Sequence, residues 1–207
     1  MQSDLSALLK AEAEAAIGDG VHYVQFDAPN YGTRLCGNRI RQELTAQGVD
    51  LERELDEAIA ADNAAMAGLQ QEGVTIGFHV CRGNHRSRWQ ADGSYDSIAE
   101  KLFSSLEVDT FLLEYDTDRA GGLEPLKHIP RGKNVVLGLI TTKDDLLESQ
   151  DGLLRRIEEA TKYVPLEHLS ISPQCGFASI SEGNLISWDG QRRKLELVNE
   201  IARKVWS

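Results

Sequence analysis

This sequence of 207 residues lacks the features of a membrane, secreted or nucleic-acid-binding protein. It has no run of about 18 apolar residues, so no segment is expected to cross a membrane. Its first residues, MQSDLSALLKAEAEAA, lack the basic and apolar parts of a secretory signal, which indicates a cytoplasmic protein. Basic residues are few: 22 Lys and Arg stand against 33 Asp and Glu. Because phosphate contacts need clustered basic residues, general nucleic-acid binding is not expected.

Cysteine is also scarce, with Cys36, Cys81 and Cys175 as the three examples. The odd number and the reducing context argue against a disulfide framework. A free cysteine is then either a small buried side chain or a metal or catalytic group. Cys36 matches no metal motif and is interpreted as a structural thiol.

What the sequence does contain is an alternation of extended and helical patterns. The predicted strands cover residues 22–27, 74–81, 110–115, 134–140 and 168–172. Helical stripes of apolar residues fall within 5–17, 51–66, 98–106, 153–160 and 195–205. Strands that alternate with helices predict an α/β fold with a parallel sheet covered on both faces. With no internal repeat or linker, residues 1–207 are predicted to form a single domain.

Several polar side chains stand at the predicted strand ends. His79 and Cys81 are two residues apart in a strand and therefore face one side, where imidazole and thiolate are both good zinc ligands. Glu114 ends the next strand, and Cys175 lies on a turn after the fifth. Each alone has a plain alternative: a buried His or Cys, a solvated strand-end carboxylate, or a small apolar filler. Together with Asp27 they fit a functional edge, because such residues gather at the carboxyl ends of parallel strands.

Four short motifs in this order resemble the cobalamin-independent methionine synthases, and most closely their short single-barrel bacterial relatives. They are the segments QFDAP at 25–29, HVC at 79–81, LE at 113–114 and PQCG at 173–176. The resemblance covers essentially the whole chain. In that family a His, two Cys and a Glu hold a catalytic zinc, and the aspartate binds the amino group of homocysteine. The resemblance therefore implies zinc ligands and a substrate ligand at matching positions, namely His79, Cys81, Glu114, Cys175 and, for the substrate, Asp27.

The activity that the resemblance implies is transfer of a methyl group to the zinc-activated thiolate of homocysteine, which gives methionine. This is the reaction of a 5-methyltetrahydropteroyltriglutamate–homocysteine methyltransferase. A methyl-folate is one candidate donor and a methylated corrinoid protein is another. Two alternatives stay open: a non-catalytic zinc-binding half or subunit, and alkyl transfer to another thiol such as coenzyme M.

The loop 82–89, with sequence RGNHRSRW, is unusually basic for so acidic a chain. It follows the HVC motif directly, so it is expected at the rim of the site. Arg82 and Asn84 are predicted to contact the substrate there, where a folate would offer an anionic tail and a ring. The alternative is a solvated loop paired with nearby acids. His85 is interpreted as a loop residue rather than a further metal ligand.

A complete barrel of this type has eight strand–helix units in about 250 residues. About five parallel units are predicted here, so the expected fold is a partial TIM (β/α)8-type barrel that matches the C-terminal catalytic half. Five strands cannot close a barrel whose tilt and shear belong to eight. The sequence therefore predicts a partner for the open sheet, either an N-terminal half-barrel chain or a second copy in a homodimer.

Overall fold

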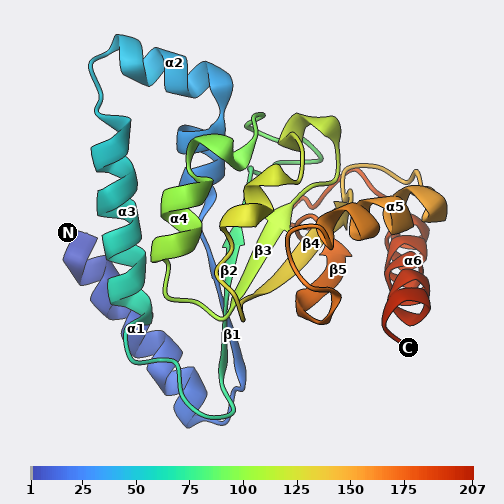
Figure 1. The fold of residues 1–207 in the computed structure, drawn as a ribbon, viewed down its shortest axis with the longest axis horizontal. Coiled ribbons are helices and arrows are strands. Elements are labelled where there is room, and N and C mark those ends of the chain that lie inside the picture. Colours follow the sequence, from blue (N-terminus) through green and yellow to red (C-terminus); the bar gives the residue numbers. More distant parts are fainter. Residues whose placement is uncertain (1) are drawn as a thin grey trace.

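The computed structural model describes residues 2–207, in which helices and strands alternate (Figure 1). The α-helices are α1 (Gln2–Gly18), α2 (Asn38–Ala46), α3 (Leu51–Met66), α4 (Ala99–Ser105), α5 (Gln150–Ala160) and α6 (Trp188–Trp206). The strands are β1 (Tyr23–Asp27), β2 (Thr75–Val80), β3 (Thr110–Glu114), β4 (Asn134–Ile140) and β5 (Leu169–Pro173). Short 3-10 turns and one π-helical turn, Tyr31–Cys36, fill the connections.

The five strands form one parallel sheet in the order β1-β2-β3-β4-β5. The register places Asp27 beside His79 and Glu114 beside Gly138, so the carboxyl ends of the strands meet at one edge. The predicted partial barrel of five parallel strand–helix units is confirmed. The sheet is open, because β1 and β5 each pair with a single neighbouring strand.

The two faces of the sheet differ in character because successive side chains in a strand point to opposite sides. On the outer face, Phe78, Phe111 and Leu137 are fully buried in the core together with apolar residues of the helices. Figure 1 shows α1 and α3 along one flank of the sheet and α5 and α6 along the other. The opposite, inner face carries the polar side chains of Gln25 and His79. The candidate site therefore lies on the inner face, at the carboxyl edge.

Helix boundaries agree with local capping chemistry. The Asp50 carboxylate accepts a hydrogen bond from the Arg53 N–H and caps α3, as its position before the helix predicts. Asp62 interrupts the apolar stripe of α3, and its carboxylate accepts a hydrogen bond of 2.6 Å from the Tyr31 hydroxyl. A polar residue is thus accommodated on a buried helix face because it has a partner.

Three features differ from the sequence-based expectation. Helix α2 and the π-helical turn Tyr31–Cys36 fall in a stretch without a clear apolar period, so neither was predicted. The apolar stripe of α1 is only partly used, since Leu5 and Leu8 are exposed whereas Ala13 is buried. Strand β2 ends at Val80, which places Cys81 just beyond the strand rather than within it.

Among the described residues, no helix combines the length and apolar character that a membrane span requires. That residues 1–207 form a single domain stays a prediction.

Candidate metal centre

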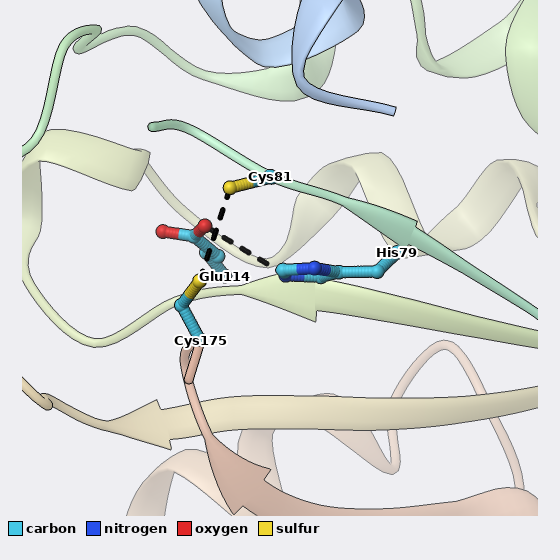
Figure 2. Close-up of side chains that lie close together, drawn as sticks. All are labelled: His79, Cys81, Glu114 and Cys175. Atoms are coloured by element: carbon cyan, nitrogen blue, oxygen red, sulfur yellow. Dashed lines mark hydrogen bonds and ion pairs between the residues drawn. The ribbon is translucent and has the colours of Figure 1, made fainter. Parts of the chain in front are cut away.

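The four predicted ligand residues come together at the carboxyl edge of the sheet (Figure 2). His79 lies in β2, Cys81 directly follows it, Glu114 ends β3, and Cys175 lies two residues beyond β5. One ligand atom from each side chain lies within 4.8 Å of the others. Residues as far apart in the sequence as 79 and 175 therefore face one small space.

The donor set fits a zinc ion. The sulfur atoms of Cys81 and Cys175 are 3.9 Å apart. Two zinc–sulfur bonds of about 2.3 Å at a tetrahedral angle would separate two sulfurs by about 3.8 Å. One imidazole nitrogen and one carboxylate oxygen complete a set of four, which is the number that zinc prefers. The cluster can thus hold a metal without rearrangement of its sulfur atoms.

His79 is oriented by contacts to both ring nitrogens. Its Nδ1 lies 3.1 Å from Asp27 Oδ1, and its Nε2 lies 3.2 Å from the Gln174 carbonyl oxygen and 3.7 Å from Glu114 Oε1. Burial alone would lower the pKa of His79, but the hydrogen bond to Asp27 and the charges of Asp27 and Glu114 raise it overall. A carboxylate on the far nitrogen is a common way to fix a histidine that binds a metal. Asp27 is half exposed, so its predicted contact with a substrate amine stays sterically open.

The two cysteine thiols are within hydrogen-bonding distance of each other. The hydrogen bond between their thiols lowers the pKa of Cys175 and raises that of Cys81, and burial raises the latter further. Without a metal, the pair therefore favours one thiolate and one thiol, because two thiolates side by side repel. The Gly83 N–H also donates to Cys81 Sγ at 3.3 Å. Close packing behind this loop depends on Gly32, where a side-chain carbon would lie 2.2 Å from the Cys81 carbonyl oxygen.

Glu114 is fully buried, and protein donors hold both of its oxygens. The backbone N–H of Arg82 donates to Oε1 at 2.8 Å, and Arg119 Nη2 donates to Oε2 at 3.0 Å. The same Arg119 nitrogen also donates to Asp116 at 2.9 Å. Arg119 was not found from the sequence, where it is a single arginine that follows Asp116 and Asp118. It fixes Glu114 in place and neutralises part of the local negative charge.

The basic loop 82–89 borders the site, but its side chains have several roles. The Arg82 guanidinium is fully buried, donates to the Gly93 carbonyl and packs over the Tyr95 ring at 4.2 Å. A substrate contact from Arg82 stays a prediction, and this core position of the guanidinium does not favour it. Trp89 is half exposed, with its ring 5.4 Å from the guanidinium of Arg119.

Asn84 joins the two cysteine loops. Its Nδ2 donates to the Gly176 carbonyl at 2.8 Å and to Ser179 Oγ at 2.9 Å, and its Oδ1 accepts from Lys143 Nζ at 2.9 Å. The amide thus ties the loop after Cys81 to the loop after Cys175. Lys143 was not found from the sequence, and burial lowers its pKa. The predicted substrate contact of Asn84 stays a prediction beside this clamping role.

Gln174 is a further polar group at the site. Its role was not predicted from the sequence, although it lies inside the PQCG motif. Its side chain is 2% exposed, and neither amide atom has a hydrogen-bond partner among the described residues. It lines a cavity of about 160 Å³ together with His79 and Cys175. Because a buried amide without partners is costly, this group is suited to hydrogen-bond a bound molecule.

Comparison with known proteins gives a family match over nearly the whole chain. The family model described as cobalamin-independent synthase, catalytic domain, matches residues 1–203. The uncharacterized protein YxjG of Bacillus subtilis is 42% identical over 207 residues, which cover 99% of this chain and 54% of that protein. A methionine synthase of Pyrococcus abyssi is 25% identical over 173 residues, which cover 84% of this chain and 42% of that enzyme.

A solved structure has the same arrangement of elements. A Listeria monocytogenes protein assigned as a vitamin-B12 independent methionine synthase superposes with a TM-score of 0.66 and 29% sequence identity. The match covers 97% of this chain and 54% of the Listeria chain. The chain therefore spans about half the length of these relatives.

Proposed function

Because the chain belongs to the cobalamin-independent methionine synthase family, whose catalytic-domain model matches residues 1–203, we propose that it carries the zinc site of a methyltransferase. In this proposal the acceptor is the thiol of homocysteine, the product is methionine, and the donor is a methyl-folate. The chain spans about half the length of these relatives. The methyl-transfer activity of a full-length enzyme is therefore itself part of what we propose for this chain.

One observation carries the proposal: a nitrogen, an oxygen and two sulfur ligands from three strand ends lie within 4.8 Å of one another. His79, Cys81, Glu114 and Cys175 would hold the zinc. A free thiol is mostly protonated at neutral pH, and a thiolate is the better nucleophile. When bound, zinc would supply the positive charge that favours the thiolate form of the acceptor.

The remaining residues would bind and orient the acceptor. Asp27 is half exposed at the edge of the site, so its free carboxylate oxygen suits an ammonium group. Gln174 offers an unpaired amide beside Cys175. Arg119 holds Glu114 through one oxygen, so Glu114 would keep a partner if a substrate sulfur took its place among the ligands. His79, Cys81 and Glu114 are buried, which limits competition from water at these groups.

The open sheet favours a second candidate, in which this chain is a zinc-binding part that is catalytic only with further barrel strands. Strands β1 and β5 each have one neighbour, and the inner-face side chain of Tyr23 on β1 is exposed. Methyl transfer depends on exact placement of donor and acceptor, which a complete barrel would supply. A partner half-barrel or a second copy would provide the missing strands.

Cobalt substitution tests the proposal, because thiolate ligands give Co²⁺ an intense absorption. Purified protein is first analysed for zinc, where about one ion per chain is expected. After exchange with Co²⁺, homocysteine should intensify the thiolate band, whereas homoserine, which lacks the sulfur, should not. An unchanged spectrum with homocysteine would remove the acceptor assignment. A chain that binds no metal would remove the site itself.

A methylation assay separates the two candidates. Homocysteine and a methyl-folate are supplied to the isolated chain and to the chain mixed with the N-terminal half of a relative. Turnover by the chain alone supports a complete enzyme, and turnover only in the mixture supports the zinc-binding part.

A further inference from the structure

A second polar cavity lies between α5 and the carboxyl ends of β3 and β4. Its volume is about 490 Å³, within the range of small-molecule sites. We call it the outer cavity and define it by Tyr115, Asp116, Leu139, Leu153 and Arg156. Tyr115 directly follows Glu114 and points to the other side of the sheet, so the outer cavity is separate from the metal centre.

Three buried polar atoms in the wall of the outer cavity are unpaired. They are the Tyr115 hydroxyl, Asp116 Oδ2 and Arg156 Nη2, and none has a hydrogen-bond partner among residues 2–207. Tyr115 is 1% exposed, and the Asp116 side chain is equally buried. Buried polar groups are almost always paired, since an unpaired one costs free energy. Three such groups around one cavity indicate a missing partner.

Two neighbouring polar residues in the same wall, Glu148 and Ser149, are satisfied within the protein. Glu148 accepts hydrogen bonds from Lys194 Nζ and from the Thr141 N–H. Ser149 caps α5 by accepting from the Gly152 N–H. Among the described residues of this wall, the buried unpaired atoms belong to Tyr115, Asp116 and Arg156.

We propose that the outer cavity binds a small zwitterion of the α-amino acid type. Asp116 Oδ2 can only accept, so it suits an ammonium group. Arg156 Nη2 can only donate, so it suits a carboxylate. The Tyr115 hydroxyl can do either, and Leu139 and Leu153 offer an apolar wall for a short aliphatic side chain.

The position of the outer cavity supports a site that this chain builds by itself. Strands β3 and β4 lie inside the sheet, away from the unpaired edges at β1 and β5. The other oxygen of Asp116 accepts from Arg119, which also binds Glu114. Asp116, which would bind the zwitterion, is therefore linked to Glu114 through two hydrogen bonds of Arg119, and the zwitterion would not contact the metal ligands.

Calorimetry with matched probes tests the proposal on the whole 207-residue chain. L-Leucine carries both charged groups, 4-methylpentanoate lacks the amine, and 3-methylbutylamine lacks the carboxylate. We expect L-leucine to bind with one site per chain and each analogue to bind at least about tenfold more weakly. Equal affinity for L-leucine and 4-methylpentanoate would overturn the zwitterion assignment.

Variants assign the binding to the outer cavity. Arg156→Gln should weaken L-leucine binding at least about tenfold. Its matched control is Arg192→Gln, which removes the same charge from an exposed position on α6 outside the cavity wall and should change the affinity less than about twofold. Tyr115→Phe should weaken L-leucine binding, whereas the melting temperature of the free protein should stay the same or rise. A loss of binding in this variant therefore could not be attributed to unfolding.

The outcomes separate this site from the metal centre. Cys175→Ser should leave L-leucine binding unchanged, even if the protein proves not to bind zinc. No binding of L-leucine at millimolar concentrations would mean that the unpaired atoms are only hydrated, and the proposal would be wrong. Equal losses in the Arg192 and Arg156 variants would indicate general charge attraction and would also overturn it.

Discussion

The metal centre and the outer cavity both lie at the end of β3. They differ in whether their buried polar groups have hydrogen-bond partners within the protein. Glu114, on the inner side, has both carboxylate oxygens paired with protein donors. Tyr115, the next residue, buries a hydroxyl without a protein partner. Arg119 connects the two regions, since it binds Glu114 and Asp116 together.

This contrast distinguishes two ways to prepare a binding site. In the candidate metal centre, protein hydrogen bonds hold His79 and Glu114 in place, which would reduce the cost of ordering them around a metal. In the outer cavity, the polar groups lack partners until a ligand binds, so the free protein carries a cost that the ligand would relieve. The following experiments test this difference, from the largest expected effect to the smallest.

The cysteines of the metal centre should be essential for metal retention. We expect Cys81→Ser and Cys175→Ser to lose zinc during dialysis, because each removes one of two sulfur ligands. Cys36→Ala is the control, since this third cysteine is buried in the core rather than in the cluster. Elemental analysis measures the result. Full zinc occupancy in either Ser variant would show that the four residues are not the ligands.

Arg119 should support both regions. Arg119→Met leaves Glu114 and Asp116 without their shared cation, and removal of one partner of a buried ion pair costs about 3–5 kcal/mol. Urea unfolding measures the loss of stability. The exposed pair of Arg192 and Asp189 provides the control, so Arg192→Met should unfold at nearly the same urea concentration. Equal effects would mean that burial of the Arg119 network has little energetic weight.

Asn84 should influence metal affinity without binding the metal. Asn84→Ala breaks the bridge between the loops after Cys81 and Cys175, and loss of such outer contacts typically weakens metal binding about 10–100-fold. Competition with a zinc chelator measures the affinity. A similar truncation of an exposed amide, Asn199→Ala on α6, should leave the affinity unchanged. An Asn84→Ala protein with normal zinc affinity would show that the loops hold their positions without the bridge.

The smallest expected effect on stability comes from two tyrosines, Tyr95 and Tyr115, whose rings are in contact with centroids 5.4 Å apart. The Tyr95 hydroxyl accepts from the Glu114 N–H and donates to the Val80 carbonyl, so Tyr95→Phe should destabilise by about 1–2 kcal/mol. Tyr115→Phe removes an unpaired hydroxyl and should be neutral or stabilising. Paired urea titrations without added ligand compare them. Equal losses of stability would indicate that the Tyr115 hydroxyl has a partner in solution.

Much of the fold and of the ligand set follows from local patterns in the sequence. Strands β2 and β3 have apolar runs, and their boundaries agree with prediction within one residue. Asp50 marks the start of α3 because a carboxylate before a helix satisfies free N–H groups. The ligand candidates were found because their residue types and order form motifs at strand ends. Their roles in substrate and metal binding stay predictions.

The rest depends on contacts between residues that are distant in the sequence. Arg119 and Lys143 belong to no motif, and their importance comes from side chains that the fold brings beside them. The outer cavity combines residues 115–116, just after β3, with Arg156 of α5, so no local pattern indicates it. The sequence by itself determined which residues end the strands and which chemistry they offer. Only the tertiary structure decided which polar groups find partners, because pairing depends on three-dimensional neighbours rather than on spacing along the chain.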